Sequence, residues 1–173
     1  MAPRDRLSGR PSRSQHSRIL GNVDVDVEVE AVIPLPPAEV AAFAGDPTNA
    51  PQWYANIQTV RWRSSPPIAV GSLLDFEAQF LGRRLVYTYR VEELVPGVRL
   101  VMRTASGPFP METTYTWEPV PGGTVMRLRN RGTPSGFSTI AAPVMARAMR
   151  RAMTKDLDRL AQRLAEAHTL PEL

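Results

Sequence analysis

The sequence contains no cysteine, and its only two histidines, His16 and His168, lie near its two ends. The absence of cysteine excludes a disulfide, a thiolate metal ligand and a thiol nucleophile. The position of the histidines excludes a catalytic histidine, or a metal site that depends on one, from the body of the domain. Neither a glycine-rich phosphate loop nor a metal-ligand spacing occurs, so we expect no metal and no cofactor.

Long apolar runs are also absent. No stretch approaches the roughly 18 apolar residues that cross a bilayer, so we expect no stable membrane insertion. The first 21 residues have no apolar segment of the kind found in secretory signals, and we therefore expect a cytoplasmic protein.

The excess of positive over negative charge is confined to the start of the chain. The first 20 residues hold five arginines and one aspartate, which accounts for the whole net charge of +4. The remainder is neutral, which argues against a nucleic-acid partner for the folded part. Residues 1–21 are rich in Arg, Ser, Pro and Gly and predict a disordered basic tail. We expect one domain over residues 22–168 and a short C-terminal tail over 169–173.

A long amphipathic helix is predicted near the C-terminus, from Ser138 to Ala167. Ser138 is a suitable N-cap, and Pro143 predicts either a kink or a start delayed to that residue. One apolar stripe recurs at steps of three and four residues. Its members are Met145, Met149, Met153, Leu157, Leu160 and Leu164. Such a helix needs a sheet to cover its stripe.

The first strand is predicted where valine alternates with acidic residues, from Val23 to Val29. Three prolines then end it. Residues 38–45 are typical of a short helix, and Asp46-Pro47 has the chemistry of a second helix start. We expect this pair of short helices to end at Trp53-Tyr54.

From Ile57 onward, apolar residues alternate with a period of two between regularly spaced turns, which predicts an antiparallel meander of six strands. We place the turns at Gly82-Arg83, Pro96-Gly97 and Gly122-Gly123. These turns predict the following opposite pairs on the inner face: Phe80 with Leu85, Ala78 with Tyr87, Phe76 with Tyr89, Val91 with Met102, Trp117 with Leu128 and Tyr115 with Asn130.

The outer faces carry complementary charge. The first strand is acidic there (Asp26, Glu28, Glu30), whereas the last strand is basic (Arg127, Arg129, Arg131). Opposite charges stabilise neighbouring strands, so we expect the first and last strands to lie side by side. The last hairpin places Glu118 opposite Arg127.

Four segments carry a family resemblance: Leu35–Val40, Asp46–Trp53, Val70–Ser72 and Met145–Ala152. Over residues 24–167 the chain resembles the START-like, or helix-grip, superfamily, and in particular its polyketide cyclase/dehydrase-like (SRPBCC) group. The resemblance implies an α+β helix-grip fold, in which a seven-stranded curved antiparallel sheet wraps round the long C-terminal helix, with two short helices after the first strand. It also implies a cavity between the sheet and that helix.

The candidate ligand-binding residues are the inward-facing aromatic and methionine side chains. They are Trp53, Phe76, Phe80, Tyr87, Tyr89, Met102, Tyr115, Trp117, Met145 and Met149. The alternative is that these side chains only fill a core. Methionine suits a wall that adapts to different apolar shapes, and three inward tyrosine hydroxyls need partners. Trp53 is either a lid over the cavity or a packing anchor for the short helices.

The leading functional hypothesis is binding or transport of an apolar or aromatic small molecule, lipid or polyketide-like, with tyrosine hydroxyls orienting its polar end. A second hypothesis is an enzyme of the polyketide cyclase or aromatase type. Alternation turns Asp75, Glu77, Glu92, Glu112 and Glu118 outward, so we assign no catalytic residue. A third is a partner-binding module that acts through its outer surface. We expect a monomer or a weak homodimer.

Overall fold

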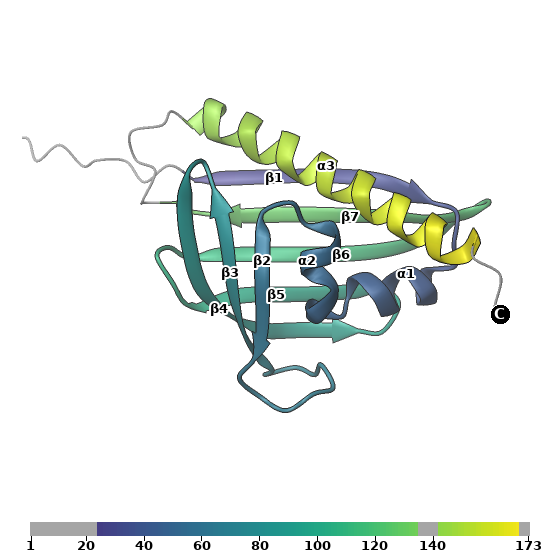
Figure 1. The fold of residues 1–173 in the computed structure, drawn as a ribbon, viewed down its shortest axis with the longest axis horizontal. Coiled ribbons are helices and arrows are strands. Elements are labelled where there is room, and N and C mark those ends of the chain that lie inside the picture. The colour runs from purple at the N-terminus through teal and green to yellow at the C-terminus, as the bar shows by residue number, and fades with distance from the viewer. Residues whose placement is uncertain (1–23, 135–141, 170–173) are drawn as a thin grey trace, which may run out of the picture.

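The computed structural model describes residues 24–134 and 142–169 and has the expected order of elements (Figure 1). The elements are β1 (Val25–Ile33), α1 (Pro37–Ala44), a 3-10 turn η1 (Pro47–Asn49), α2 (Ala50–Trp53), β2 (Ile57–Trp62), β3 (Leu73–Phe80), β4 (Arg83–Val95), β5 (Arg99–Ser106), β6 (Met111–Val120), β7 (Gly123–Gly132) and α3 (Ala142–Thr169). None of the helices in these two ranges is both long and apolar enough to cross a membrane. The predicted basic tail of residues 1–21 lies outside the described residues, as do residues 170–173.

The seven strands form one antiparallel sheet in the order β1-β7-β6-β5-β4-β3-β2. In Figure 1, β2 and β3 run across the direction of β1, β7 and β6, so the sheet curls, and α3 crosses its open side. The long strand β4 makes the bend, and its register to β5 shifts at Thr88/Tyr89 and at Val91/Glu93. Such bulges bend a strand. The predicted helix-grip fold is confirmed.

The charge complementarity of the first and last strands is confirmed. Strands β1 and β7 pair along their whole length. Arg129 forms a bidentate pair with Asp26, with its Nε 2.7 Å from Oδ1, and the Arg127 Nε lies 3.0 Å from the Glu30 Oε2. Because these pairs are exposed, they contribute little to the stability of the fold. Their main effect is to favour the pairing of β1 with β7.

The predicted register of the β3–β4 hairpin is wrong by two residues. The turn is Leu81-Gly82, with φ values of 47° and 74°, so Phe76 lies opposite Tyr87 instead of Tyr89. Positive φ at both central residues is the signature of a type I′ turn, which matches the twist of a hairpin. A shift of two residues leaves every side chain on its predicted face, since strand side chains alternate with a period of two.

The predicted register of the β6–β7 hairpin is wrong by two residues as well. Its turn is Pro121-Gly122, with a glycine φ of 83°, so Tyr115 lies opposite Leu128. Proline followed by glycine is typical of a type II turn, which outweighs the Gly-Gly pair that follows. In contrast, the predicted pairing of Val91 with Met102 in the β4–β5 hairpin is confirmed.

The Glu118–Arg127 pair is retained on a diagonal, with Thr116 rather than Glu118 directly opposite Arg127. The Arg127 Nη1 lies 2.6 Å from the Glu118 Oε1. We expect a double-mutant cycle of Glu118→Gln and Arg127→Gln, measured by urea unfolding, to give a coupling of a few tenths of a kcal/mol, since both groups are partly exposed. A coupling indistinguishable from zero would contradict this.

Helix α3 is described from Ala142, one residue before Pro143, and the predicted alternatives of a kink or a delayed start stay predictions. Ser138, the predicted N-cap, lies outside the described residues. The whole predicted stripe is buried, from Met145 to Leu164, with exposed fractions of 8% or less. The sheet and α3 therefore share one apolar core, to which α1 and α2 add the residues at its far end.

Candidate ligand cavity

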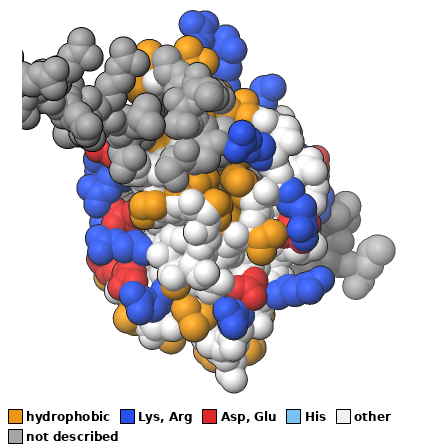
Figure 2. Space-filling model, turned by 90° about the vertical axis from the view of Figure 1, so that its left-hand side faces the viewer, with side chains coloured by type: hydrophobic (Ala, Val, Ile, Leu, Met, Phe, Trp, Pro, Cys, Tyr) orange, Lys and Arg blue, Asp and Glu red, His pale blue; other side chains and the backbone are white. Residues whose placement is uncertain are grey.

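A cavity of about 130 Å³ lies between the inner face of the sheet and the N-terminal half of α3. This is room for several water molecules, because about 10–15 Å³ counted over the positions of a water centre holds one. Figure 2 views the end of the molecule that lies at the left of Figure 1, where apolar side chains reach the surface between charged margins. The described part of the cavity wall is almost wholly apolar.

Eight of the ten predicted site residues line this cavity. They are Phe76, Phe80, Tyr87, Tyr89, Met102, Tyr115, Met145 and Met149. Strand alternation brings the first six together from four strands, and helical spacing brings the two methionines over them. Their part in binding a ligand stays a prediction.

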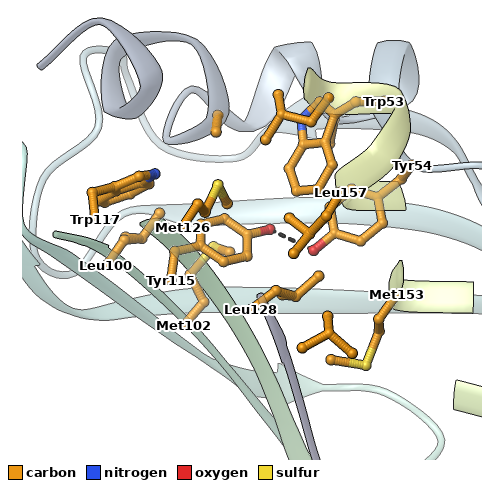
Figure 3. Packing of buried hydrophobic residues seen from close by; sticks show 14 of the residues in the cluster. Trp53, Tyr54, Leu100, Met102, Tyr115, Trp117, Met126, Leu128, Met153 and Leu157 are labelled. Carbon is orange, nitrogen blue, oxygen red and sulfur yellow. Dashed lines mark hydrogen bonds between the residues drawn. The ribbon is translucent and has the colours of Figure 1, made fainter. Parts of the chain in front are cut away.

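The other two predicted residues, Trp53 and Trp117, do not line the cavity. Trp53 is fully buried at the end of α2, and its ring lies 3.9 Å from that of Tyr54, between centroids (Figure 3). This position corresponds to a packing anchor rather than a lid. Trp117 does point inward, but it packs beneath the end of α1, where its ring lies 3.4 Å from the place that a Cβ on Gly45 would take.

The sequence analysis did not assign Tyr54, which reaches the cavity from the end of α2. Its hydroxyl lies 2.7 Å from that of Tyr115, as the dashed line in Figure 3 shows. Burial raises the pKa of both hydroxyls well above the usual value, so both stay protonated at neutral pH. Tyr54 sits in an irregular segment, where no periodicity predicts the direction of a side chain.

A second polar chain crosses the sheet at the cavity wall. The Thr113 hydroxyl donates to the Asn130 Oδ1 at 2.7 Å, and the Tyr89 hydroxyl lies 2.8 Å from the Thr113 oxygen. Because the threonine proton is used toward Asn130, Tyr89 is the donor of the second bond. Burial raises the pKa of Tyr89 to about 12. This hydroxyl thus has a fixed protein partner.

Tyr87 is the tyrosine whose hydroxyl has no hydrogen-bond partner among the described residues. Its ring stacks on Phe76 at 5.5 Å between centroids, and none of the hydrogen bonds within residues 24–134 and 142–169 involves its oxygen. Burial raises its pKa, so it is a neutral donor at the cavity wall. A ligand can use this group without displacing a protein partner.

The most important residue that the sequence analysis missed is Asp156 of α3. It is 2% exposed, it lines the cavity, and its Oδ1 accepts a hydrogen bond from the Ala55 N–H at 2.8 Å. Burial raises its pKa to about 6, against the opposing effects of the Ala55 bond and of Arg159. Its spacing could have revealed it, because it lies three residues after Met153 and four before Leu160 on the buried stripe.

The carboxylates of the strands lie on the outer face of the sheet, as predicted. Glu112, for example, lies between Arg103 and Arg131, with both oxygens 2.6 Å from an arginine nitrogen. In the described part of the chain, no three His, Asp or Glu residues come together in a way that could hold a metal ion. Among the described residues, the polar side chains of the cavity wall are therefore four tyrosines, two threonines, two asparagines and one carboxyl group: Tyr54, Tyr87, Tyr89, Tyr115, Thr104, Thr113, Asn56, Asn130 and Asp156.

Comparison with known families gives one match, to the model described as "Polyketide cyclase / dehydrase and lipid transport", over residues 24–165. No curated protein sequence matches the chain.

Solved structures similar to this one share its fold. The protein TTHA0849 from Thermus thermophilus has a TM-score of 0.71 at 19% identity, covering 82% of this chain and 98% of its own. A START superfamily protein from Mycobacterium smegmatis gives 0.70 at 14%, with 82% and 98% covered. The Zhui aromatase/cyclase from Streptomyces sp. R1128 gives 0.64 at 15%, with 81% and 93% covered. At these identities the likeness concerns the fold alone.

Proposed function

The chain belongs to the polyketide cyclase/dehydrase and lipid transport family, and from this membership we propose that it binds an apolar or aromatic small molecule in the cavity beneath α3. The observation that carries the proposal is the cavity itself, whose wall is apolar except for a few hydroxyl, amide and carboxyl groups. Cavities of this composition bind by burying apolar surface, at about 25 cal/mol per Å², and use the few polar groups for orientation.

The methionine content of the wall supports a ligand site over a filled core. Five of the seven methionines in the sequence line the cavity: Met102, Met111, Met145, Met149 and Met153. Methionine is unbranched and polarisable, so its side chain adjusts to irregular apolar shapes. A wall built in this way accommodates a ligand without a fixed outline.

The free hydroxyl of Tyr87 supports a ligand with one polar end. Tyr54, Tyr89 and Tyr115 already have protein partners, whereas the Tyr87 oxygen has none within the part of the chain that the structure describes. A neutral donor in an apolar wall is costly unless something accepts its proton. Water or the polar end of a ligand fills that role.

N-phenyl-1-naphthylamine, a neutral apolar dye that fluoresces when it leaves water, tests the proposal. We expect saturable binding to the intact protein, and we expect Met149→Trp to weaken it at least tenfold, because the larger ring occupies the cavity. Thr154→Trp is the matched control, since Thr154 lies on the exposed side of the same helix. Equal binding by both variants would place the dye elsewhere and reject the cavity.

A second candidate function is catalysis of the cyclase type, and the observation that favours it is Asp156. An aldol cyclisation followed by loss of water needs a group that takes up and returns a proton, and a carboxyl with a pKa of about 6 suits that task. Incubation with a poly-β-ketone thioester, followed by mass spectrometry, tests it. Loss of water that depends on Asp156 supports catalysis, and recovery of the substrate with both its mass and its chromatographic retention unchanged rejects it.

A further inference from the structure

Only one oxygen of the Asp156 carboxyl group has a hydrogen-bond partner among the described residues. The Oδ1 accepts the Ala55 N–H, but no residue in the described ranges donates a hydrogen bond to Oδ2, and Asp156 lines the cavity. A carboxylate accepts up to four hydrogen bonds, and an incompletely paired one inside a protein is expensive. If its purpose were only to bind the Ala55 N–H, an asparagine oxygen would serve without the charge.

Among the described residues, no positive charge faces this carboxyl group from the cavity. The sequence has 21 lysine and arginine residues, yet none of the described residues that line the cavity is basic, and Asp156 is the only acidic one among them. Arg159 acts on Asp156 from the exposed side of the same helix and is not part of the cavity wall. An anionic ligand would therefore meet a like charge, and no counter-ion among the described lining residues.

The wall opposite α3 contains a cluster of aromatic rings. The Phe76, Tyr87 and Tyr89 rings form one cluster, with centroids 5.0–5.5 Å apart. The face of an aromatic ring attracts a cation, and the attraction grows when the site is shielded from water. A carboxylate and a cluster of aromatic rings in the wall of one cavity are groups suited to binding an ammonium group.

We propose that the cavity selects apolar or aromatic ligands that carry a protonated amine, with the ammonium group bound to the Asp156 carboxylate, and that it discriminates against fatty acids and other apolar carboxylates. This inference rests on the proposed function, because it names the class of ligand for the same cavity. Charge-assisted hydrogen bonds are about twice as strong as neutral ones, so the amine gains over an alcohol of the same size.

Three probes with one carbon skeleton test the proposal: 4-phenylbutylamine, 4-phenylbutan-1-ol and 4-phenylbutyric acid. Isothermal titration calorimetry with the full chain at pH 7.5 should give the amine an affinity at least tenfold above that of the alcohol, with the acid weakest. Equal affinities, or an acid that binds best, would overturn the proposal.

The pH dependence supplies a test that needs no variant. Among the described residues, the ionisable groups that act on Asp156 are the hydroxyls of Tyr54 and Tyr115, which stay neutral, and the guanidinium of Arg159 on the exposed side of the helix. The amine also stays protonated below pH 8. Affinity for 4-phenylbutylamine should therefore fall about tenfold from pH 7 to pH 5 as the carboxylate, with a pKa of about 6, becomes protonated. An unchanged affinity would contradict the proposal.

Asp156→Asn should remove the preference for the amine and leave the alcohol within about twofold, because the Ala55 N–H keeps an acceptor. Asp158→Asn, at an exposed position two residues away, should change neither ligand. If N-phenyl-1-naphthylamine binds but Asp156→Asn keeps the amine preference, this inference fails and the proposed function stands. If neither the dye nor the three probes bind, both fail.

Discussion

Replacing Leu160 by alanine is expected to lower the free energy of unfolding by about 2–5 kcal/mol. Leu160 is fully buried in the C-terminal half of the α3 stripe and belongs to the core that the helix shares with the sheet. The substitution removes the transfer free energy of three carbon atoms and leaves a space that rigid β-sheet neighbours fill only in part. Urea unfolding followed by circular dichroism measures the change.

Val144→Ala is the control for this substitution. Val144 lies on the same helix with 59% of its surface exposed, so its loss should change the free energy of unfolding by less than about 0.5 kcal/mol. A loss below about 1 kcal/mol for Leu160→Ala would mean that the helix does not depend on this stripe for its attachment to the sheet.

Asp156→Asn is expected to stabilise the protein at pH 7 by about 3 kcal/mol, the order of magnitude that a pKa of about 6 implies for a group with a usual value of 3.8. The folded state binds the Asp156 proton more tightly than the unfolded state does. Stability from this group is therefore fully present below about pH 4 and is lost as the pH rises to about 6. The advantage of the asparagine variant should grow over the same interval.

The measurement is the difference in free energy of unfolding between Asp156→Asn and the unsubstituted protein from pH 4 to pH 7.5. A difference is needed because other carboxyl groups act in the opposite direction, such as Asp26, whose pKa is lowered by its hydrogen bond to Arg129. Asp158→Asn should give a flat difference near zero. A flat line for Asp156→Asn would show that its carboxyl group is not destabilised by burial.

A gain in stability on removal of a charge has a functional meaning. A protein that keeps a destabilising, incompletely paired carboxylate inside a ligand cavity retains it for something other than folding. The stability and binding experiments therefore test the role of the same side chain by two independent measurements. The proposed amine site predicts that the more stable variant is also the one that loses its ligand preference.

The residues of the cavity wall could be predicted from the sequence where they lie on regular strands or on the long helix. Alternation in β3, β4, β5 and β6 predicted that Phe76, Tyr87, Met102 and Tyr115 face inward. The two-residue error in the position of two turns left the face of each side chain unchanged. The period of a strand fixes the face of a side chain, whereas the register depends on the turn. The turn type in turn depends on backbone angles, such as the positive φ of Leu81, that composition does not specify.

The site residues that were predicted wrongly, or not predicted at all, are those whose neighbours come from distant segments of the chain. Trp117 lies on the inner face, as its alternation requires, but α1 covers that end of the sheet and leaves it outside the cavity. Trp53 and Tyr54 are neighbours at the end of α2, and one is an anchor while the other reaches the cavity. No local pattern separates them.

The sequence by itself determined the order of the elements, the faces of the strands, the buried stripe of α3 and the pairing of β1 with β7, because each follows from a local period or from charges on matching faces. Only the tertiary structure decided which inward side chains border an open space and which hydroxyls are satisfied. The tertiary structure also decided the burial of Asp156 and the pKa of its carboxyl group. An aspartate on a helix is ordinarily solvated, and the raised pKa of this one comes from its burial beneath the segment that holds Ala55, which lies 101 residues away in the chain.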